Sequence, residues 1–381
     1  MLKLEARPEP SRAMSIASPL MALAITVVIG TVLFLLLGTD PLRGLAVFFV
    51  EPLRSVYALT ELAVKATPLL LIALGLAVCF RSNVWNIGAE GQYIVGAIAA
   101  SGVAMQATAS TGAWFFVAVI AAGAIGGMLW AAIVALLRDR FHANEILVSL
   151  MLVYVAEQLL NYLVYGPWKD PAGYNFPQTI TFLKATQVPK LFAGYRVNVG
   201  APLALAAVAL FWVLLFRTYA GFQLQVGGLA PAAARYAGFS SRKALWSALL
   251  LSGAMAGLAG GLELAGPLGQ LTPHVPVGYG FAAIIVAFVG RLHPVGIVFS
   301  AILMSMFYIG GELAQSRLGL PKSLTGVFQG LLLFTLLACD TLIAYRLRWA
   351  EPRVAPPAPP IDDAPLNPVV ASTTLPAREG T

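Results

Sequence analysis

The sequence predicts an all-α protein, a polytopic membrane helix bundle of about ten transmembrane helices. Hydrophobic residues occupy 59% of the 381 positions and charged residues only 11%, whereas a soluble domain carries about 25% charged residues. The apolar residues gather in runs of the length that crosses a bilayer, about 20 residues. The basic residues behind the net charge of +7 are scattered at the ends of these runs. There they orient a membrane protein, so the charge does not indicate nucleic-acid binding.

Ten apolar segments are expected to span the membrane. The first, from Met14 to Leu37, follows basic residues as a signal peptide does. It is longer than the apolar region of a signal peptide and no A-x-A cleavage pattern follows it, so we interpret it as a retained helix. The eighth segment is short and fits a crossing, a half-helix or a re-entrant segment. The segments are residues 14–37, 58–80, 91–108, 113–137, 146–165, 200–216, 245–266, 277–290, 295–314 and 324–344.

The distribution of Lys and Arg among the loops places both termini in the cytoplasm. Residues 1–13 are then a cytoplasmic N-terminus and residues 14–344 the transmembrane domain. The longest external loop, 166–199, is either a plain connector or a surface that contacts a binding protein. Residues 217–244 form the longest internal loop. Residues 345–381 are rich in Pro, Ala and Thr without apolar periodicity, which predicts a disordered cytoplasmic tail.

One polar stretch, from Arg81 to Gln92, separates the second and third apolar segments. Polar side chains and flexible backbone are costly near lipid depth unless they line protein or water. The stretch therefore predicts a helix break near a transport path. Its distinctive residues are Arg81, Asn83, Asn86, Gly88, Glu90, Gly91 and Gln92.

The motifs of an enzyme are missing from the sequence. Neither an H-E-x-x-H pattern nor a Cys/His cluster occurs, so we expect no metal site. A G-x-x-x-x-G-K-[ST] phosphate loop and a G-x-S-x-G nucleophile elbow are also missing. The two cysteines, Cys79 and Cys339, fall in apolar segments and are typical of small core residues. With no catalytic residue and no cofactor expected, a transporter subunit or a channel remains.

The internal loop contains a pattern typical of a short helix at about residues 228–239. Pro231 suits the first turn, alanines favour helix, and Gly238 suits the end. A compact helix between two spans is either an ordinary connector or a docking site for a soluble partner. The residues expected to carry the docking are Gly228, Pro231, Ala233, Ala234, Arg235 and Gly238.

Three stretches together resemble permeases of ABC importers of the ribose/branched-chain-amino-acid type, most closely the nucleoside (guanosine-type, simple-sugar-like) subgroup. Asn86-Ile-Gly-Ala-Glu-Gly-Gln92 is similar to the N-I-G-A-E-G-Q signature of that subgroup. Gly228 to Phe239 is similar to its coupling helix, and Gly278 to Pro294 to its G-Y-G-F segment. Ala230 and Ala232 depart from the pattern of the coupling helix. The resemblance extends over residues 58–344.

The resemblance implies an ATP-driven importer in the bacterial plasma (inner) membrane. This chain would form half of the path together with a second, similar permease. A cytoplasmic ABC ATPase would dock on the coupling helices, and an external substrate-binding protein or lipoprotein would deliver nucleosides, with simple sugars as the next expectation. The alternative from another class is a secondary transporter or channel that works without ATP.

The candidate path residues each have a structural and a functional interpretation. Glu90 either caps the third span or accepts hydrogen bonds from ribose hydroxyls. The asparagines either satisfy backbone groups of the turn or bind a sugar. Trp85 is either an interfacial anchor or a stacking partner for a base. Glu157, in the middle of the fifth span, is expected to face the bundle interior or a polar path. The full set is Asn83, Trp85, Asn86, Glu90, Gln92 and Glu157.

Two further patterns concern packing between helices. Glu61 and Lys65 are four residues apart, a spacing that predicts a mutual ion pair on one helix face. Gly253, Gly257 and Gly261 share a face of the seventh segment, where another helix is expected to approach closely.

Overall fold

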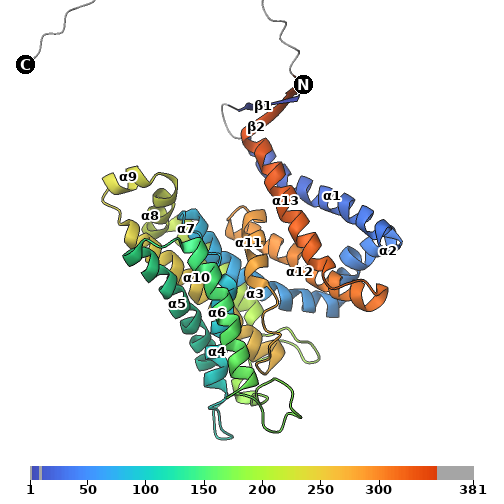
Figure 1. Cartoon of the computed structure of the whole chain (residues 1–381), viewed down its shortest axis with the longest axis vertical. Helices are drawn as coiled ribbons and strands as arrows, with labels where there is room; N and C mark the ends of the chain where they lie inside the picture. The colour runs from blue at the N-terminus through green and yellow to red at the C-terminus, as the bar shows by residue number, and fades with distance from the viewer. Residues whose placement is uncertain (1, 8–10, 350–381) are drawn as a thin grey trace, which may run out of the picture.

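The computed structural model describes residues 2–7 and 11–349, which form a helical bundle with one short two-stranded ribbon (Figure 1). Eight helices of this described part are long and apolar enough to cross a membrane. This confirms the predicted multi-pass, helical membrane fold. The eight are α1 (Arg12–Leu36), α3 (Val56–Arg81), α5 (Phe115–Phe141), α6 (Glu145–Tyr165), α7 (Gly200–Arg217), α10 (Ser241–Glu263), α12 (Pro294–Leu318) and α13 (Leu324–Ala344).

Two of the ten predicted segments form shorter helices. The third corresponds to α4 (Ala89–Ala104) and the eighth to α11 (Tyr279–Val289). At 1.5 Å per residue they are about 24 Å and 16 Å long, against about 30 Å of hydrocarbon. Helix α11 is thus shorter than a full crossing, as expected of a half-helix or a re-entrant segment.

Helix α3 is the centre of the bundle. Its side chains from Leu69 to Cys79 are all buried, because α10, α11, α12 and α7 pack around it. This explains its apolar composition on every face, which is typical of a helix buried on all sides. The helices α1, α6, α7 and α13 lie outside this core and leave most of their surface uncovered by the chain itself.

Glycines bring the backbones of α4, α5 and α10 into contact, as predicted for the glycine face of the seventh segment. A Cβ added at Gly257 would lie 2.2 Å from the carbonyl oxygen of Gly123. One added at Gly253 would lie 2.4 Å from Cβ of Ala131. At Gly261 the nearest atom would be 3.5 Å away, which is ordinary contact. The close approach therefore depends on the first two glycines and hardly on the third.

The two ends of the bundle differ. The upper end in Figure 1 carries α8 (Tyr219–Leu229), α9 (Pro231–Tyr236) and an antiparallel ribbon of β1 (Leu2–Ala6) and β2 (Tyr345–Trp349). The connection 166–199 lies at the lower end, with a single 3₁₀ turn at Lys184–Thr186. Between α1 and α3, the short helix α2 (Pro41–Leu45) leads into a π-helical turn, Ala46–Val50, and a 3₁₀ turn, Glu51–Leu53.

The predicted disordered tail, residues 345–381, falls mainly outside the described residues. Its first five residues, Tyr345–Trp349, form strand β2, which pairs with β1 in the register Leu2↔Trp349. The predicted boundary at residue 345 is therefore five residues too early, because a strand partner from the other end of the chain supplies hydrogen bonds that local composition does not reveal.

Replacing Gly257 with alanine is expected to destabilise the bundle by about 1–3 kcal/mol, because the added Cβ forces α5 and α10 apart. The matched variant, Gly261→Ala, should be nearly neutral because its Cβ meets only ordinary contacts. The thermal stability of both variants in detergent, followed by size-exclusion chromatography after heating, checks this. Equal melting temperatures of the two variants would contradict the packing described here.

Candidate functional site at the helix break

The polar stretch from Arg81 to Gln92 contains a helix break, as predicted. Helix α3 ends at Arg81, and the chain then runs without helical structure until α4 begins at Ala89. Asn83 has a left-handed backbone, with φ of 55°, which asparagine tolerates better than most residues. The backbone N–H of Ile87 donates a hydrogen bond to Oγ of Ser149, at 3.2 Å. Because Ser149 lies about one turn into α6, the chain re-enters the bundle at that point.

A pair of buried amides holds the break together. Asn86 Nδ2 donates to Oε1 of Gln92 and to Oγ of Ser252, both at 3.0 Å. In return, Gln92 Nε2 and the backbone N–H of Gly88 donate to Oδ1 of Asn86, both at 3.1 Å. Asn86 and Gln92 are at most 1% exposed. Their polar atoms thus satisfy each other, the turn and α10, and in this conformation they face no open space.

Glu90 joins the break to α11. Its carboxylate accepts hydrogen bonds from the backbone N–H groups of Gly278, at 2.9 Å, and Gly280. These are among the first donors of α11, which have no partner within their own helix, and the positive end of a helix stabilises a carboxylate. A Cβ added at Gly280 would lie 2.2 Å from the backbone nitrogen of Glu90. The first and third stretches of the resemblance are therefore in direct contact.

Asn83 and Trp85 lie at the edge of the break and are exposed. Trp85 Nε1 donates to Oδ1 of Asn83 at 3.2 Å, and the indole packs beside Phe80 and Phe288, with ring centroids 5.4 Å and 6.3 Å away. The structure thus divides the predicted path residues. Asn86, Glu90 and Gln92 are buried together, whereas Asn83 and Trp85 are at the surface.

Arg81 connects the break to the upper end of the bundle. Its Nε donates to the carbonyl oxygen of Leu292 at 2.8 Å, and a terminal nitrogen donates to Oε1 of Gln225 on α8 at 2.9 Å. The guanidinium also lies over the ring of Phe216, 5.0 Å from its centroid. A Cβ at Gly228 would lie 2.1 Å from the carbonyl oxygen of Arg81, so α8 rests directly on the end of α3. From the sequence, Arg81 was expected only to orient the chain in the membrane by its charge, and these contacts were not predicted.

The predicted helix at 228–239 is divided in two, which corrects that prediction. Gly228 belongs to the end of α8, and α9 covers only Pro231–Tyr236. Ala230 between them has φ of −142°, because a residue that precedes proline is pushed out of the helical region. After α9, Gly238 turns the chain with φ of 78°, as expected of a glycine at the end of a helix.

The predicted coupling residues have different surroundings. Ala234 is buried, whereas Pro231, Ala233, Arg235 and Gly238 are exposed. Leu229 and Tyr236 add two exposed hydrophobic side chains, 85% and 98% accessible, which the sequence analysis did not single out. Behind α9 lies a groove of about 760 Å³ between α8 and the adjoining ends of α5 and α10. Its lining includes the acid Asp139 and four basic side chains, namely Arg138, Arg235, Arg242 and Lys243.

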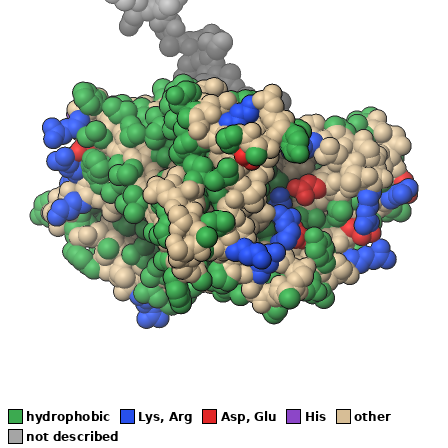
Figure 2. All heavy atoms as spheres, turned by 90° about the horizontal axis from the view of Figure 1, so that it is seen from below, with side chains coloured by type: hydrophobic (Ala, Val, Ile, Leu, Met, Phe, Trp, Pro, Cys, Tyr) green, Lys and Arg blue, Asp and Glu red, His purple; other side chains and the backbone are tan. Residues whose placement is uncertain are grey.

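Ion pairs at the lower end correct the predicted pair of Glu61 and Lys65. Glu61 pairs with Arg196 of the connection 166–199, at 3.1 Å, and Lys65 pairs with Glu312 of α12, at 3.2 Å. Each side chain thus pairs with a residue of another segment, which approaches it closely from outside α3, and not with the residue four positions away. Seen from below, acidic and basic side chains lie near one another on the right of the molecule (Figure 2).

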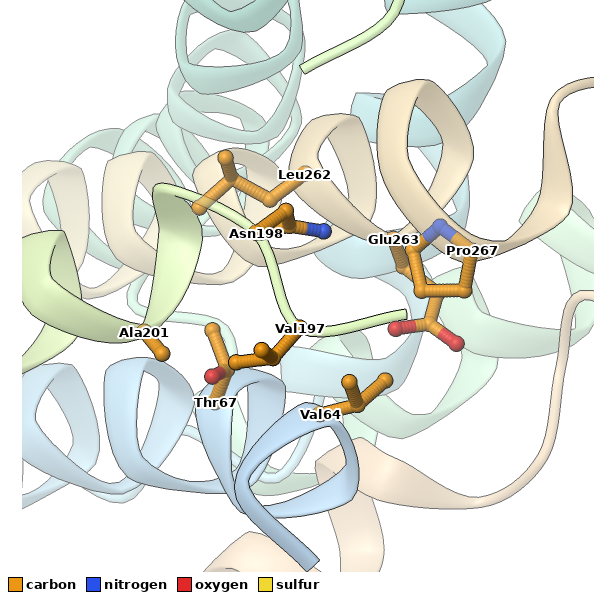
Figure 3. Close-up of a pocket in the computed structure, with 8 residues that line it drawn as sticks. All are labelled: Val64, Thr67, Val197, Asn198, Ala201, Leu262, Glu263 and Pro267. Carbon is orange, nitrogen blue, oxygen red and sulfur yellow. The ribbon is translucent and has the colours of Figure 1, made fainter. Parts of the chain in front are cut away.

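A small pocket at the end of α10 contains an acid that the sequence analysis missed. Glu263 is 9% exposed, and its carboxylate points into the pocket near Val64 and Val197 (Figure 3). Asn198 and Thr67 supply the other polar side chains of the lining. The signal was available, because Glu263 is the one acid in the apolar segment 245–266.

Glu157, the sixth predicted path residue, lies apart from the amide pair on α6 and is half-buried. It makes no hydrogen bond or ion pair among the described residues. Its helix, α6, packs against α4, which begins at the end of the break.

This fold and site define a multi-pass membrane protein whose central helix leads into a hydrogen-bonded break and whose upper end presents an exposed helical segment. The chain belongs to the family described as branched-chain amino acid transport system / permease component, which matches residues 58–337. The resemblance found in the three sequence stretches is thereby confirmed. Membership of a permease family is consistent with a transport subunit that is not itself an enzyme.

Relatives extend the similarity over nearly the whole chain. The glucose ABC transporter permease protein of Haloferax volcanii is 33% identical over 94% of this chain and 96% of its own length. The guanosine ABC transporter permease protein of Bacillus subtilis is 30% identical over 81% of this chain and 89% of its own. The nucleoside ABC transporter permease protein of Lactococcus lactis subsp. cremoris is 25% identical over 83% and 89%. No solved structure matches.

Replacing Glu90 with alanine should lower the free energy of unfolding by about 1–3 kcal/mol, because two buried N–H groups of α11 lose their acceptor. Glu90→Gln should cost less, since its amide oxygen still accepts one hydrogen bond. The melting temperatures of the purified variants check the order. Equal losses for both would show that the carboxylate is not the acceptor that matters.

Proposed function

We propose that the chain is the transmembrane permease subunit of an ATP-driven ABC importer. Its proposed solutes are nucleosides first and simple sugars second. The names of the relatives support both classes, since they include guanosine, nucleoside and glucose transporters. The sequence has no phosphate loop of its own, so a partner supplies ATP hydrolysis. The proposed setting is the plasma (inner) membrane of a bacterium, with α8 and α9 on the cytoplasmic side.

The single observation that carries the proposal is the direct contact between α8 and the end of α3. Gly228 packs on the carbonyl of Arg81, whose side chain binds Gln225. An ATPase that moves α9 and α8 would therefore move the end of the central helix. The break starts one residue later and leads to Glu90 and α11. A closing ATPase is thus coupled to the middle of the bundle, as alternating access requires.

The surface offered to the ATPase is the tip formed by α8 and α9. Leu229 and Tyr236 provide exposed apolar area, and Arg235 adds a positive charge beside them. Exposed aromatic and Arg side chains are enriched where proteins bind one another. A short helix with apolar and basic side chains suits a cleft with apolar and acidic lining on the partner.

The remaining partners follow from the same proposal. A second permease completes the path, and an external substrate-binding protein or lipoprotein delivers the solute at the lower end, where the connection 166–199 lies. Arg196 ties this connection to α3 through Glu61. The buried polar residues Asn86, Glu90 and Gln92 support the break, and Asn83 and Trp85 border it. Glu157 remains a proposed path residue.

Arg235→Glu, combined with Tyr236→Ala, is expected to lower recovery of the ATPase on purification of the tagged permease, because the tip loses its charge and its largest apolar side chain. About tenfold less partner corresponds to 1.4 kcal/mol of binding free energy. Lys322→Glu, at the other end of the bundle, is the control and should leave recovery unchanged. Undiminished recovery with the double variant would contradict docking at α9.

Uptake measurements test the function itself. The two permeases, the ATPase and the binding protein are reconstituted in liposomes and given labelled guanosine or labelled glucose. We expect uptake that requires ATP hydrolysis, with guanosine favoured. Uptake of glucose alone would assign the second solute class. Uptake that an ion gradient drives without ATP would overturn the importer proposal in favour of a secondary transporter.

A further inference from the structure

The outward face of α6 carries polar and aromatic side chains among apolar ones, of which Leu147, Met151 and Val155 are 59%, 55% and 51% exposed. Tyr154 and Tyr162 are 56% and 67% exposed, and Gln158 between them is also exposed. Because these residues are four apart, they lie on one side of the helix. Glu157 and Asn161 border them and are half-buried. The side chains of Glu157, Gln158 and Asn161 have no hydrogen-bond or ion-pair partner among the described residues.

Other helices of the bundle have apolar outward faces. The side chains that α5, α7 and α13 expose are those expected against lipid. They include Ile125, Leu129 and Ile133 on α5, Leu203, Leu210 and Val213 on α7, and Val327, Phe334 and Leu337 on α13. The face of α6 is therefore not the result of a general tolerance for polar residues on the outside of this chain.

The depth of Tyr154, Glu157 and Gln158 rules out an interfacial explanation for these three residues. Helix α6 runs from Glu145 to Tyr165, so Tyr154 and Gln158 lie within about 5 Å of its midpoint along the axis. Tyrosines that anchor a helix in the membrane interface lie near its ends, as Tyr165 does. Carboxylate and amide groups at mid-membrane depth face a bundle interior or water, not lipid.

Among the described residues, the helices that pack on α6 are mainly α4 and α5, and they cover its other side. The buried side of α6 is formed by Ser149, Val153, Ala156 and Leu160. In Figure 1 the helix lies at the front of the bundle. Water therefore has to reach the outward face in the assembled transporter, and the surface suited to it is a path shared with the second permease.

We propose that Tyr154, Glu157, Gln158, Asn161 and Tyr162 form a wall of the transport path and bind the transported solute. The tyrosine rings pack against its ring, and the amide and carboxylate groups bind its hydroxyls. This inference rests on the proposed function, because it takes a second permease to close the path on the opposite side. The proposed wall gives the solute a binding surface around Glu157, whereas the polar side chains of the break bind one another. The wall lies beside the break because α6 packs on the start of α4, where a Cβ added at Gly91 would lie 3.0 Å from Cα of Val153.

Cysteine labelling of the complete transporter tests the wall. Gln158→Cys and Tyr154→Cys are treated with a membrane-impermeant, cationic methanethiosulfonate reagent. Leu129→Cys on α5 and Leu210→Cys on α7 are the controls, since both lie at similar depth on exposed apolar faces. The unmodified chain serves as the blank, because Cys79 and Cys339 are buried. Labelling after denaturation corrects for the amount of protein.

We expect the two α6 variants to react at least about tenfold faster than the controls, because water reaches only the polar face. Saturating guanosine or glucose should slow the reaction. Equal, low reactivity at all four positions, or rapid labelling that neither solute slows, would overturn the inference. Uptake by the unmodified complex is measured in parallel. If ATP-driven uptake is present while the labelling fails, only the wall is wrong, whereas absent uptake contradicts the proposed function.

Discussion

The structure depends on one constraint: a chain that leaves its helix inside a membrane protein must satisfy its backbone polar groups without water. In the break after α3, Oδ1 of Asn86 accepts from the backbone N–H of Gly88, and Oγ of Ser149 accepts from that of Ile87. Gln92 and Ser252 hold the Asn86 side chain in place. Glu90 accepts from the backbone at the start of α11. The same few side chains thereby fix where α4 begins and how α11 is placed against it. The starts of the two short helices α4 and α11 thus meet inside the bundle and are joined by Glu90.

This arrangement also explains why distant stretches of sequence act together. Glu90 and Gly278 are 188 residues apart and share a hydrogen bond. Arg81 reaches Gln225, 144 residues away. Through these contacts the tip at α9, the central helix and the break form one mechanical unit. Glycines at 228 and 280 are required where the backbones touch, which gives them a steric role within that unit.

The sequence was a good guide to segments and a poorer guide to contacts. Long apolar runs predicted the spanning helices. Pro231 marked the start of α9 and Gly238 the turn after it, but the predicted helix at 228–239 is divided between α8 and α9. Local spacing failed for Glu61 and Lys65, since Arg196 and Glu312 approach them from other segments. It also missed Glu263 and the polar face of α6, because exposure is a property of the packed bundle. A tyrosine in an apolar run reads the same whether it faces lipid, protein or water.

By itself, the sequence determined that this is a multi-pass helical membrane protein with a polar break, since hydrophobicity and length decide which segments can cross lipid. It also contained the stretches that mark the permease family. The tertiary structure alone decided which polar groups are satisfied and which remain open. Asn86 and Gln92 are equivalent to Gln158 in chemistry, yet the first two are enclosed by partners and the third is not. The reason is physical: a hydrogen bond depends on atoms within about 3 Å, and only folding brings them together.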